Sequence, residues 1–122
     1  RSFYLVDLPG YGFTKASVEV RGRLETLICW YLFDSKYEQK KVVLIIDAKI
    51  GPTKDDLDML HSLKERKKRI VVVANKIDKI KRSECKHQLE KIEAMVNVHK
   101  FIPYSAKKKI GVGALINELL IK

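Results

Sequence analysis

Short apolar runs alternate with longer stretches of helical periodicity along this chain. The apolar runs have the length and composition of strands in a buried parallel sheet: Phe3 to Asp7, Val42 to Asp47, Ile70 to Ala74, and Phe101 to Tyr104. After each run, apolar side chains recur at helical spacing, which predicts helices from about Ser17 to Phe33, from Thr53, from Ser83 to about Val96, and at the chain's end, with Leu115, Ile116, Leu119 and Leu120 inward. This alternation predicts an α/β fold built from parallel βαβ units.

Cap residues support two of these helices. Thr53 precedes Asp56 by three residues, which is the spacing of a capping box. Ser83 is the predicted cap of the next helix.

The continuous apolar run from Val42 to Asp47 predicts a strand that is covered on both faces.

Unusual loops follow all four predicted strands. They come after Val6, Ile46, Ala74 and Tyr104. In an open parallel sheet, ligands bind beyond the carboxyl ends of the strands. We therefore expect a binding site at that edge of the sheet.

The first loop reads Asp7-Leu8-Pro9-Gly10. A carboxylate at a strand end can hold Mg²⁺, usually through water, and Gly10 would let a backbone N–H approach a γ-phosphate. Alone, this DxxG pattern is a weak signal that many proteins carry by chance, and the alternative interpretation is a simple turn after a strand.

The loop Asn75-Lys76-Ile77-Asp78 makes a more specific prediction. Guanine presents two adjacent N–H donors, at N1 and N2, and the carboxylate of Asp78 can accept from both. Adenine lacks this pair and would leave the carboxylate unpaired. The apolar stem of Lys76 can lie along the base. The alternative interpretation is an ordinary strand-to-helix turn.

The last loop, Ser105-Ala106-Lys107, offers backbone N–H groups to the guanine O6, and Lys107 can cover the ring. The DxxG, NKxD and SAK motifs occur in the order of the later motifs of a GTPase. The segments FYLVDLPGYGF, IDAKIGPT with GPTKDDLDML, NKIDK and YSAKKKIGVGAL closely resemble the EngB family of bacterial GTPases, and the likeness runs from Phe3 nearly to the end.

The resemblance implies a Ras-like P-loop NTPase G domain with a mostly parallel sheet flanked by helices, and it covers residues 1–122 as the C-terminal portion of a single such domain. It implies binding of GTP or GDP with Mg²⁺ and a role in large ribosomal subunit assembly, with a link to cell division and septation. It matches Asp7 to the Mg²⁺-associated carboxylate. It assigns the γ-phosphate loop to Leu8, Pro9 and Gly10, and the base contacts to Asn75, Lys76, Ile77, Asp78, Tyr104, Ser105 and Ala106.

A phosphate-binding GxxxxGK sequence followed by Ser or Thr occurs nowhere in the 122 residues. That loop cradles the phosphates and its hydroxyl binds Mg²⁺. We therefore expect a domain without its first strands and P-loop, whose GTP binding is weak and whose hydrolysis depends on a missing N-terminal segment or a complementing chain. Tyr11 follows Gly10 where Ras-like enzymes carry a catalytic Gln, which predicts slow intrinsic hydrolysis.

The net charge is +10, which suits a phosphate-rich partner such as the ribosomal large subunit or rRNA, although scattered lysines can also reflect composition alone.

Cys29 and Cys85 form no CxxC pair, and no apolar run approaches the ~20 residues that span a bilayer. We expect a cytoplasmic protein without a membrane partner. Two alternatives remain: a non-enzymatic ribosome- or RNA-binding remnant, and one half of a split GTPase.

Overall fold

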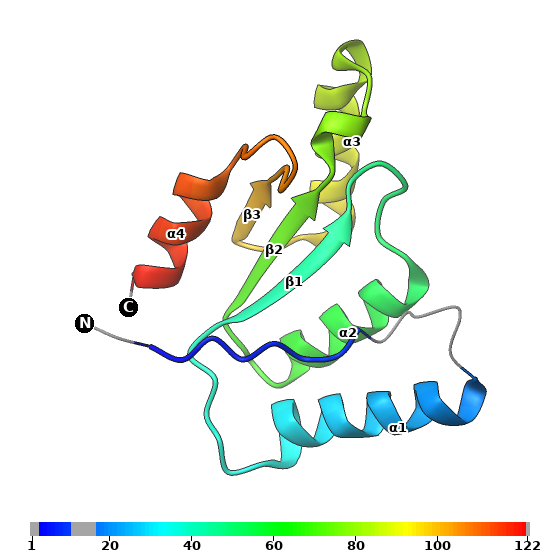
Figure 1. Cartoon of the computed structure of the whole chain (residues 1–122), viewed down its shortest axis with the longest axis vertical. Helices are drawn as coiled ribbons and strands as arrows, with labels where there is room; N and C mark the ends of the chain where they lie inside the picture. The colour runs from blue at the N-terminus through cyan, green and yellow to red at the C-terminus, as the bar shows by residue number, and fades with distance from the viewer. Residues whose placement is uncertain (1–2, 11–16, 122) are drawn as a thin grey trace. The chain divides into compact units, whose positions relative to one another are not determined.

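The computed structural model describes residues 3–10 and 17–121 (Figure 1). They divide into two units, Arg1–Gln39 and Lys40–Lys122. In the first unit, helix α1 (Val18–Cys29) continues into a π-helical turn, Trp30–Asp34. The side chain of Ser17 caps α1 by accepting a hydrogen bond from the N–H of Val20 at 3.2 Å. The helix predicted from about Ser17 to Phe33 is confirmed.

The strand predicted from Phe3 to Asp7 is wrong. Residues 3–10 have no regular secondary structure, and Phe3, Tyr4, Leu5 and Val6 are all exposed. A strand needs a neighbouring strand to accept and donate its backbone hydrogen bonds, and no strand pairing in the described part of the chain includes these residues. Tyr11 and Gly12, in the same predicted loop, lie outside the described residues.

The second unit contains a parallel sheet, as predicted. Its described strands are β1 (Val42–Asp47), β2 (Ile70–Asn75) and β3 (Lys100–Pro103), in the order β1-β2-β3. Val42 pairs with Ile70 at one end of the first pair and Asp47 with Asn75 at the other. Helices α2 (Lys54–Glu65), α3 (Arg82–Val96) and α4 (Val112–Leu120) accompany the strands (Figure 1). The α/β architecture is therefore confirmed.

Alternating side chains divide the core between the two faces of the sheet. On one face, Val71, Val73 and Ile102 form a cluster against which Leu115 of α4 packs. Leu44, Ile46, Val72 and Ala74 occupy the alternate positions and are buried as well. The prediction that Val42 to Asp47 is covered on both faces is wrong at Ile45, which is 63% exposed.

The helix ends and faces differ in part from the sequence pattern. The capping box of Thr53 and Asp56 is present. The Ser83 cap is wrong, because the N–H of Glu84 already bonds to the carbonyl of Lys81 and α3 begins at Arg82. In α4, Leu115 is partly buried, whereas Ile116 is 50% exposed. Leu119 is partly buried like Leu115, whereas Leu120, also predicted to face inward, is 45% exposed. Leu115 and Leu119 lie four residues apart on one face of the helix, and Ile116 and Leu120 are rotated by about 100° from that face.

Among the described residues, no helix is both long enough and apolar enough to cross a lipid bilayer.

Candidate functional site

The carboxyl ends of the three strands lie at one edge of the sheet, as the arrowheads in Figure 1 show. Backbone hydrogen bonds join the loops that follow them. The N–H of Ala48 donates to the carbonyl of Asn75 at 2.7 Å, and the N–H of Ile77 donates to the carbonyl of Tyr104 at 3.2 Å. The loops after β1, β2 and β3, which are three of the four loops predicted at this edge, therefore form one connected surface.

Asp78 and Ser105 form the central polar contact of this surface. Ser105 is fully buried, and its hydroxyl donates to Oδ1 of Asp78 at 2.7 Å. The same hydroxyl accepts from the N–H of Lys108 at 3.0 Å. The hydrogen bond from Ser105 lowers the pKa of Asp78 below its ordinary value near 3.8. The carboxylate is thus charged at neutral pH and held in one orientation by a side chain from a different loop.

Asn75 forms a second contact between the same two loops. It is the last residue of β2, and its Oδ1 accepts from the N–H of Ala106 at 3.1 Å. The backbone of Lys76, the next residue, is left-handed, with φ of 71°. This conformation ends the strand abruptly. The reversal lets residues 77–79 form a short 3₁₀ turn that carries Asp78.

Asp47 is a site residue that motif matching missed. It ends β1, and its Oδ2 lies 3.1 Å from Nζ of Lys76. Its Oδ1 accepts from the N–H of Lys49 at 2.9 Å. Burial raises the pKa of Asp47, but the hydrogen bonds from Lys76, Lys49 and Ile50 outweigh burial and lower the pKa below its ordinary value near 3.8. The signal in the sequence was a carboxylate at the end of an apolar run.

Gln88 of α3 also supports the site, and nothing in the sequence pattern indicated it. Its Nε2 donates to the carbonyl of Ala48 at 3.0 Å and to that of Lys49 at 3.3 Å. These bonds tie the loop after β1 to the helix that follows β2. Gln88 of α3 therefore holds the loop that carries Asp47, and Asp47 in turn holds the ammonium of Lys76.

The loop after β3 is closed by a pair of backbone hydrogen bonds between Ser105 and Ile110, both of 3.0 Å. Ala106 and Lys107 lie exposed at its tip. The Tyr104 side chain packs against the core cluster of Val71, Val73 and Ile102, while its carbonyl holds the N–H of Ile77. Tyr104 thus contributes to the site through its backbone.

Asp7, Leu8, Pro9 and Gly10 belong to the first unit, whereas every contact described above lies within the second. Asp7 and Gly10 are exposed, and Leu8 and Pro9 are half-buried. The structure thus brings together the predicted residues from Asn75 to Asp78 and from Tyr104 to Lys107. A role for Asp7 to Gly10 at this edge stays a prediction.

The solved structures that resemble this chain include GTP-binding domains. A crystal structure of a probable GTP-binding protein EngB matches with a TM-score of 0.78 and 26% identity, covering 93% of this chain and 72% of that one. The G domain of FeoB from Methanococcus jannaschii matches with a TM-score of 0.65 and 29% identity, covering 93% and 67%. The fold is therefore that of a P-loop GTPase G domain.

Sequence relatives define the family more closely. A family model for the N-terminal part of FeoB, described as "Ferrous iron transport protein B", matches residues 1–119. The "Probable GTP-binding protein EngB" of Myxococcus xanthus is 36% identical over 118 residues, and that of Clostridium acetobutylicum is 37% identical over 120. The alignments cover 95% and 96% of this chain but only 57% and 60% of those proteins. The chain belongs to the family that this FeoB model describes. Within it, the sequence relatives show that the chain is an EngB-like GTPase domain.

Proposed function

We propose that the loops after β2 and β3 recognise the guanine base of GTP and GDP. The observation that carries this proposal is the Asp78 carboxylate, which Ser105 holds in place at 2.7 Å. A fixed, charged carboxylate can accept from both N1–H and N2–H of guanine. Adenine offers no such pair of donors, so an adenine nucleotide would leave this acceptor without a partner.

The surrounding contacts prepare the rest of the base site. Nζ of Lys76 is anchored to Asp47, which leaves its apolar stem to lie along the base. The N–H groups of Ala106 and Lys108 are already paired with Asn75 and Ser105. Among the described residues, the intervening N–H of Lys107 has no partner, and we assign it to the guanine O6.

We assign the loop from Asp7 to Gly10 to the γ-phosphate side of the nucleotide. A nucleotide-bound Mg²⁺ takes most of its ligands from phosphate oxygens and water, with one or two carboxylates from the protein. The described residues contain no group of three or more His, Cys, Asp or Glu side chains that could hold a metal. A single carboxylate, Asp7, fits the nucleotide-bound ion, which would neutralise phosphate charge. GTP would order this loop and hydrolysis would release it.

Catalysis requires more than these residues supply. No GxxxxGK sequence followed by Ser or Thr occurs among the 122 residues. Since phosphoryl transfer depends on positioning and charge stabilisation by such a loop, this chain alone should bind GTP weakly and hydrolyse it very slowly. We propose that a further segment or a complementing chain supplies the loop and completes a single G domain.

The cellular role that we propose is that of a GTPase switch in large ribosomal subunit assembly in the cytoplasm, linked to cell division and septation. The likeness to EngB proteins and the net charge of +10 support this role. A positively charged domain gains affinity for RNA because bound counterions are released from the phosphates.

The test of guanine recognition is the substitution Asp78→Asn. An amide can donate to the C2 carbonyl of xanthine, so affinity should move from GDP to the xanthine nucleotide XDP. We expect the affinity ratio for GDP over XDP to fall about 100-fold or more, measured by calorimetric titration at high nucleotide concentration.

Asp58→Asn is the matched control, because it removes the same charge from an exposed position on α2 that pairs with Lys54 across one helical turn. It should leave the ratio unchanged. An unchanged preference in Asp78→Asn would sink the proposal. A wild-type chain without guanine preference would favour the non-enzymatic RNA-binding alternative.

A further inference from the structure

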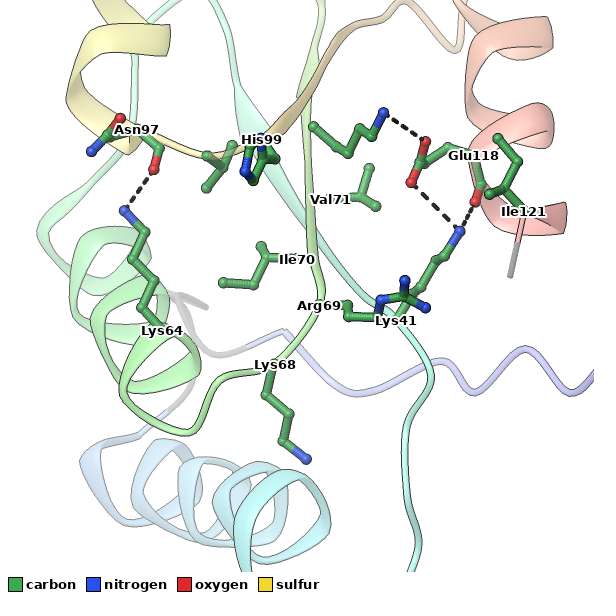
Figure 2. Close-up of a pocket in the computed structure, with 12 residues that line it drawn as sticks. Lys41, Lys64, Lys68, Arg69, Ile70, Val71, Asn97, His99, Glu118 and Ile121 are labelled. Carbon is green, nitrogen blue, oxygen red and sulfur yellow. Dashed lines mark hydrogen bonds and ion pairs between the residues drawn. The ribbon is translucent and has the colours of Figure 1, made fainter.

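A second candidate site lies at the opposite edge of the sheet. A cavity of about 550 Å³ opens where the strands begin (Figure 2). Ile70 and Lys100, the first residues of β2 and β3, line it, together with Lys41 immediately before β1. Each strand rises about 3.3 Å per residue, so the two ends of the six-residue β2 lie roughly 17 Å apart. The cavity is thus separate from the loops that carry Asp78.

The lining of this cavity is strongly basic. Its charged residues are one carboxylate, Glu118, and five cations: Lys41, Lys64, Lys68, Arg69 and Lys100. Glu118 reaches Nζ of Lys41 at 3.5 Å and Nζ of Lys100 at 3.7 Å, as the dashed lines in Figure 2 show. One carboxylate cannot neutralise five cations, so the cavity carries a net positive charge.

Two of these cations are available to a ligand in different ways. Nζ of Lys64 is held by the carbonyls of Val96 at 2.7 Å and Asn97 at 2.9 Å (Figure 2). These neutral acceptors fix the ammonium at the rim without cancelling its charge. Arg69 is exposed, and its guanidinium has no side-chain partner among the described residues. A guanidinium of this kind can bind a phosphate through two parallel hydrogen bonds.

The positive surface continues beyond the cavity. Five of the six residues from Lys64 to Arg69 are basic, and Arg66 and Lys67 lie exposed next to the lining residues. A small phosphorylated ligand would not reach all of them, whereas a chain of phosphates would. The lining contains no Phe, Tyr or Trp side chain on which a base could stack, and the imidazole of His99 is its single ring. Both features favour recognition of a polyanionic backbone over recognition of bases.

We propose that this amino-edge cavity and the adjoining run from Lys64 to Arg69 bind the phosphate backbone of RNA. The phosphate chemistry follows from the lining, while the choice of RNA rests on the proposed role in ribosome assembly. Because the guanine site lies at the other edge of the sheet, RNA and nucleotide can be bound together.

The experiment compares two double variants that lose the same charge. Lys67→Gln with Arg69→Gln removes two exposed cations of the basic run, and Lys86→Gln with Lys91→Gln removes two exposed cations of α3 as the matched control. Binding of fluorescein-labelled polyuridylate is measured by polarisation over a series of KCl concentrations. Loss of two phosphate contacts should weaken binding about tenfold. It should also reduce the magnitude of the slope of log affinity against log salt concentration by about 1.4. The control should change neither.

Three outcomes overturn the proposal. These are equal weakening by both double variants, no binding of polyuridylate by the wild-type chain, and displacement of the RNA by inorganic phosphate beyond the effect of KCl at equal ionic strength. The last result would instead show a small-anion site. GDP should leave RNA binding unchanged. If Asp78→Asn shows no shift toward XDP while the RNA result holds, the guanine proposal fails and this one stands.

Discussion

Gly111 connects the loop after β3 to α4, and its replacement by Ala should destabilise the protein. Its φ is +84°, in the left-handed region that residues with a Cβ rarely adopt. A Cβ built there would lie 2.4 Å from the carbonyl oxygen of Pro103. The carbonyl of Gly111 also accepts the first helical hydrogen bond of α4, from Leu115 at 3.0 Å. Neither the backbone of Pro103 nor that of Gly111 can move without disturbing the loop between them.

Two costs add in Gly111→Ala. The left-handed conformation costs an L-residue about 1–2 kcal/mol. Relief of a contact with a backbone atom costs about 1–3 kcal/mol, as in overpacked cores, because no flexible side chain can turn away. We expect a loss of about 2–5 kcal/mol in the free energy of unfolding. The displaced loop carries Ser105, so guanine affinity should fall as well.

The same substitution two residues later should act in the opposite direction. Gly113 lies in the first turn of α4, and a Cβ there would have no atom within 4 Å. Gly113→Ala should stabilise the chain by up to about 1 kcal/mol, because Ala loses less backbone entropy in a helix. Urea unfolding followed by circular dichroism measures both variants. If Gly111→Ala unfolds at the same urea midpoint as the wild type or above it, the steric reasoning is refuted.

Two further substitutions test individual contacts. Asp47→Asn should lower stability at neutral pH by less than about 1 kcal/mol, since the carboxylate is partly solvated. The pKa of Asp47 is lower in the folded than in the unfolded chain, so its stabilisation is complete above about pH 5 and declines as the pH falls below about 4. Urea midpoints of the two proteins should therefore draw closer as the pH falls, and a gap that does not narrow between pH 5 and pH 3 would contradict the assignment. Thr53→Ala removes the acceptor for the N–H of Asp56 at 3.1 Å and should cost about 1 kcal/mol in thermal unfolding, whereas Thr53→Ser should cost far less. Equal losses in both would show that the capping hydroxyl contributes nothing.

Local chemistry allowed much of the fold to be predicted from sequence. Strand-forming runs such as Val42 to Asp47 and Ile70 to Ala74 are apolar and β-branched, and these properties act within a few residues. The capping box of Thr53 and Asp56 is likewise a local contact, and the structure contains it. Motif order along alternating strands and helices was sufficient to predict a GTPase domain. The EngB-like family was predicted from the resemblance of particular segments, and the relatives support it.

Contacts between distant segments were decided only by the tertiary structure. Phe3 to Asp7 has the composition of a strand but lacks a described neighbouring strand, and no local property supplies those hydrogen bonds. The Ser105 hydroxyl reaches Asp78 across 27 residues, and Lys76 reaches Asp47 across 29. The basic cavity likewise exists only because Lys41, Arg69 and Lys100 begin or adjoin neighbouring parallel strands. Side-chain type and spacing are written in the sequence, whereas the meeting of such groups depends on strand order and register, which arise only when the whole sheet forms.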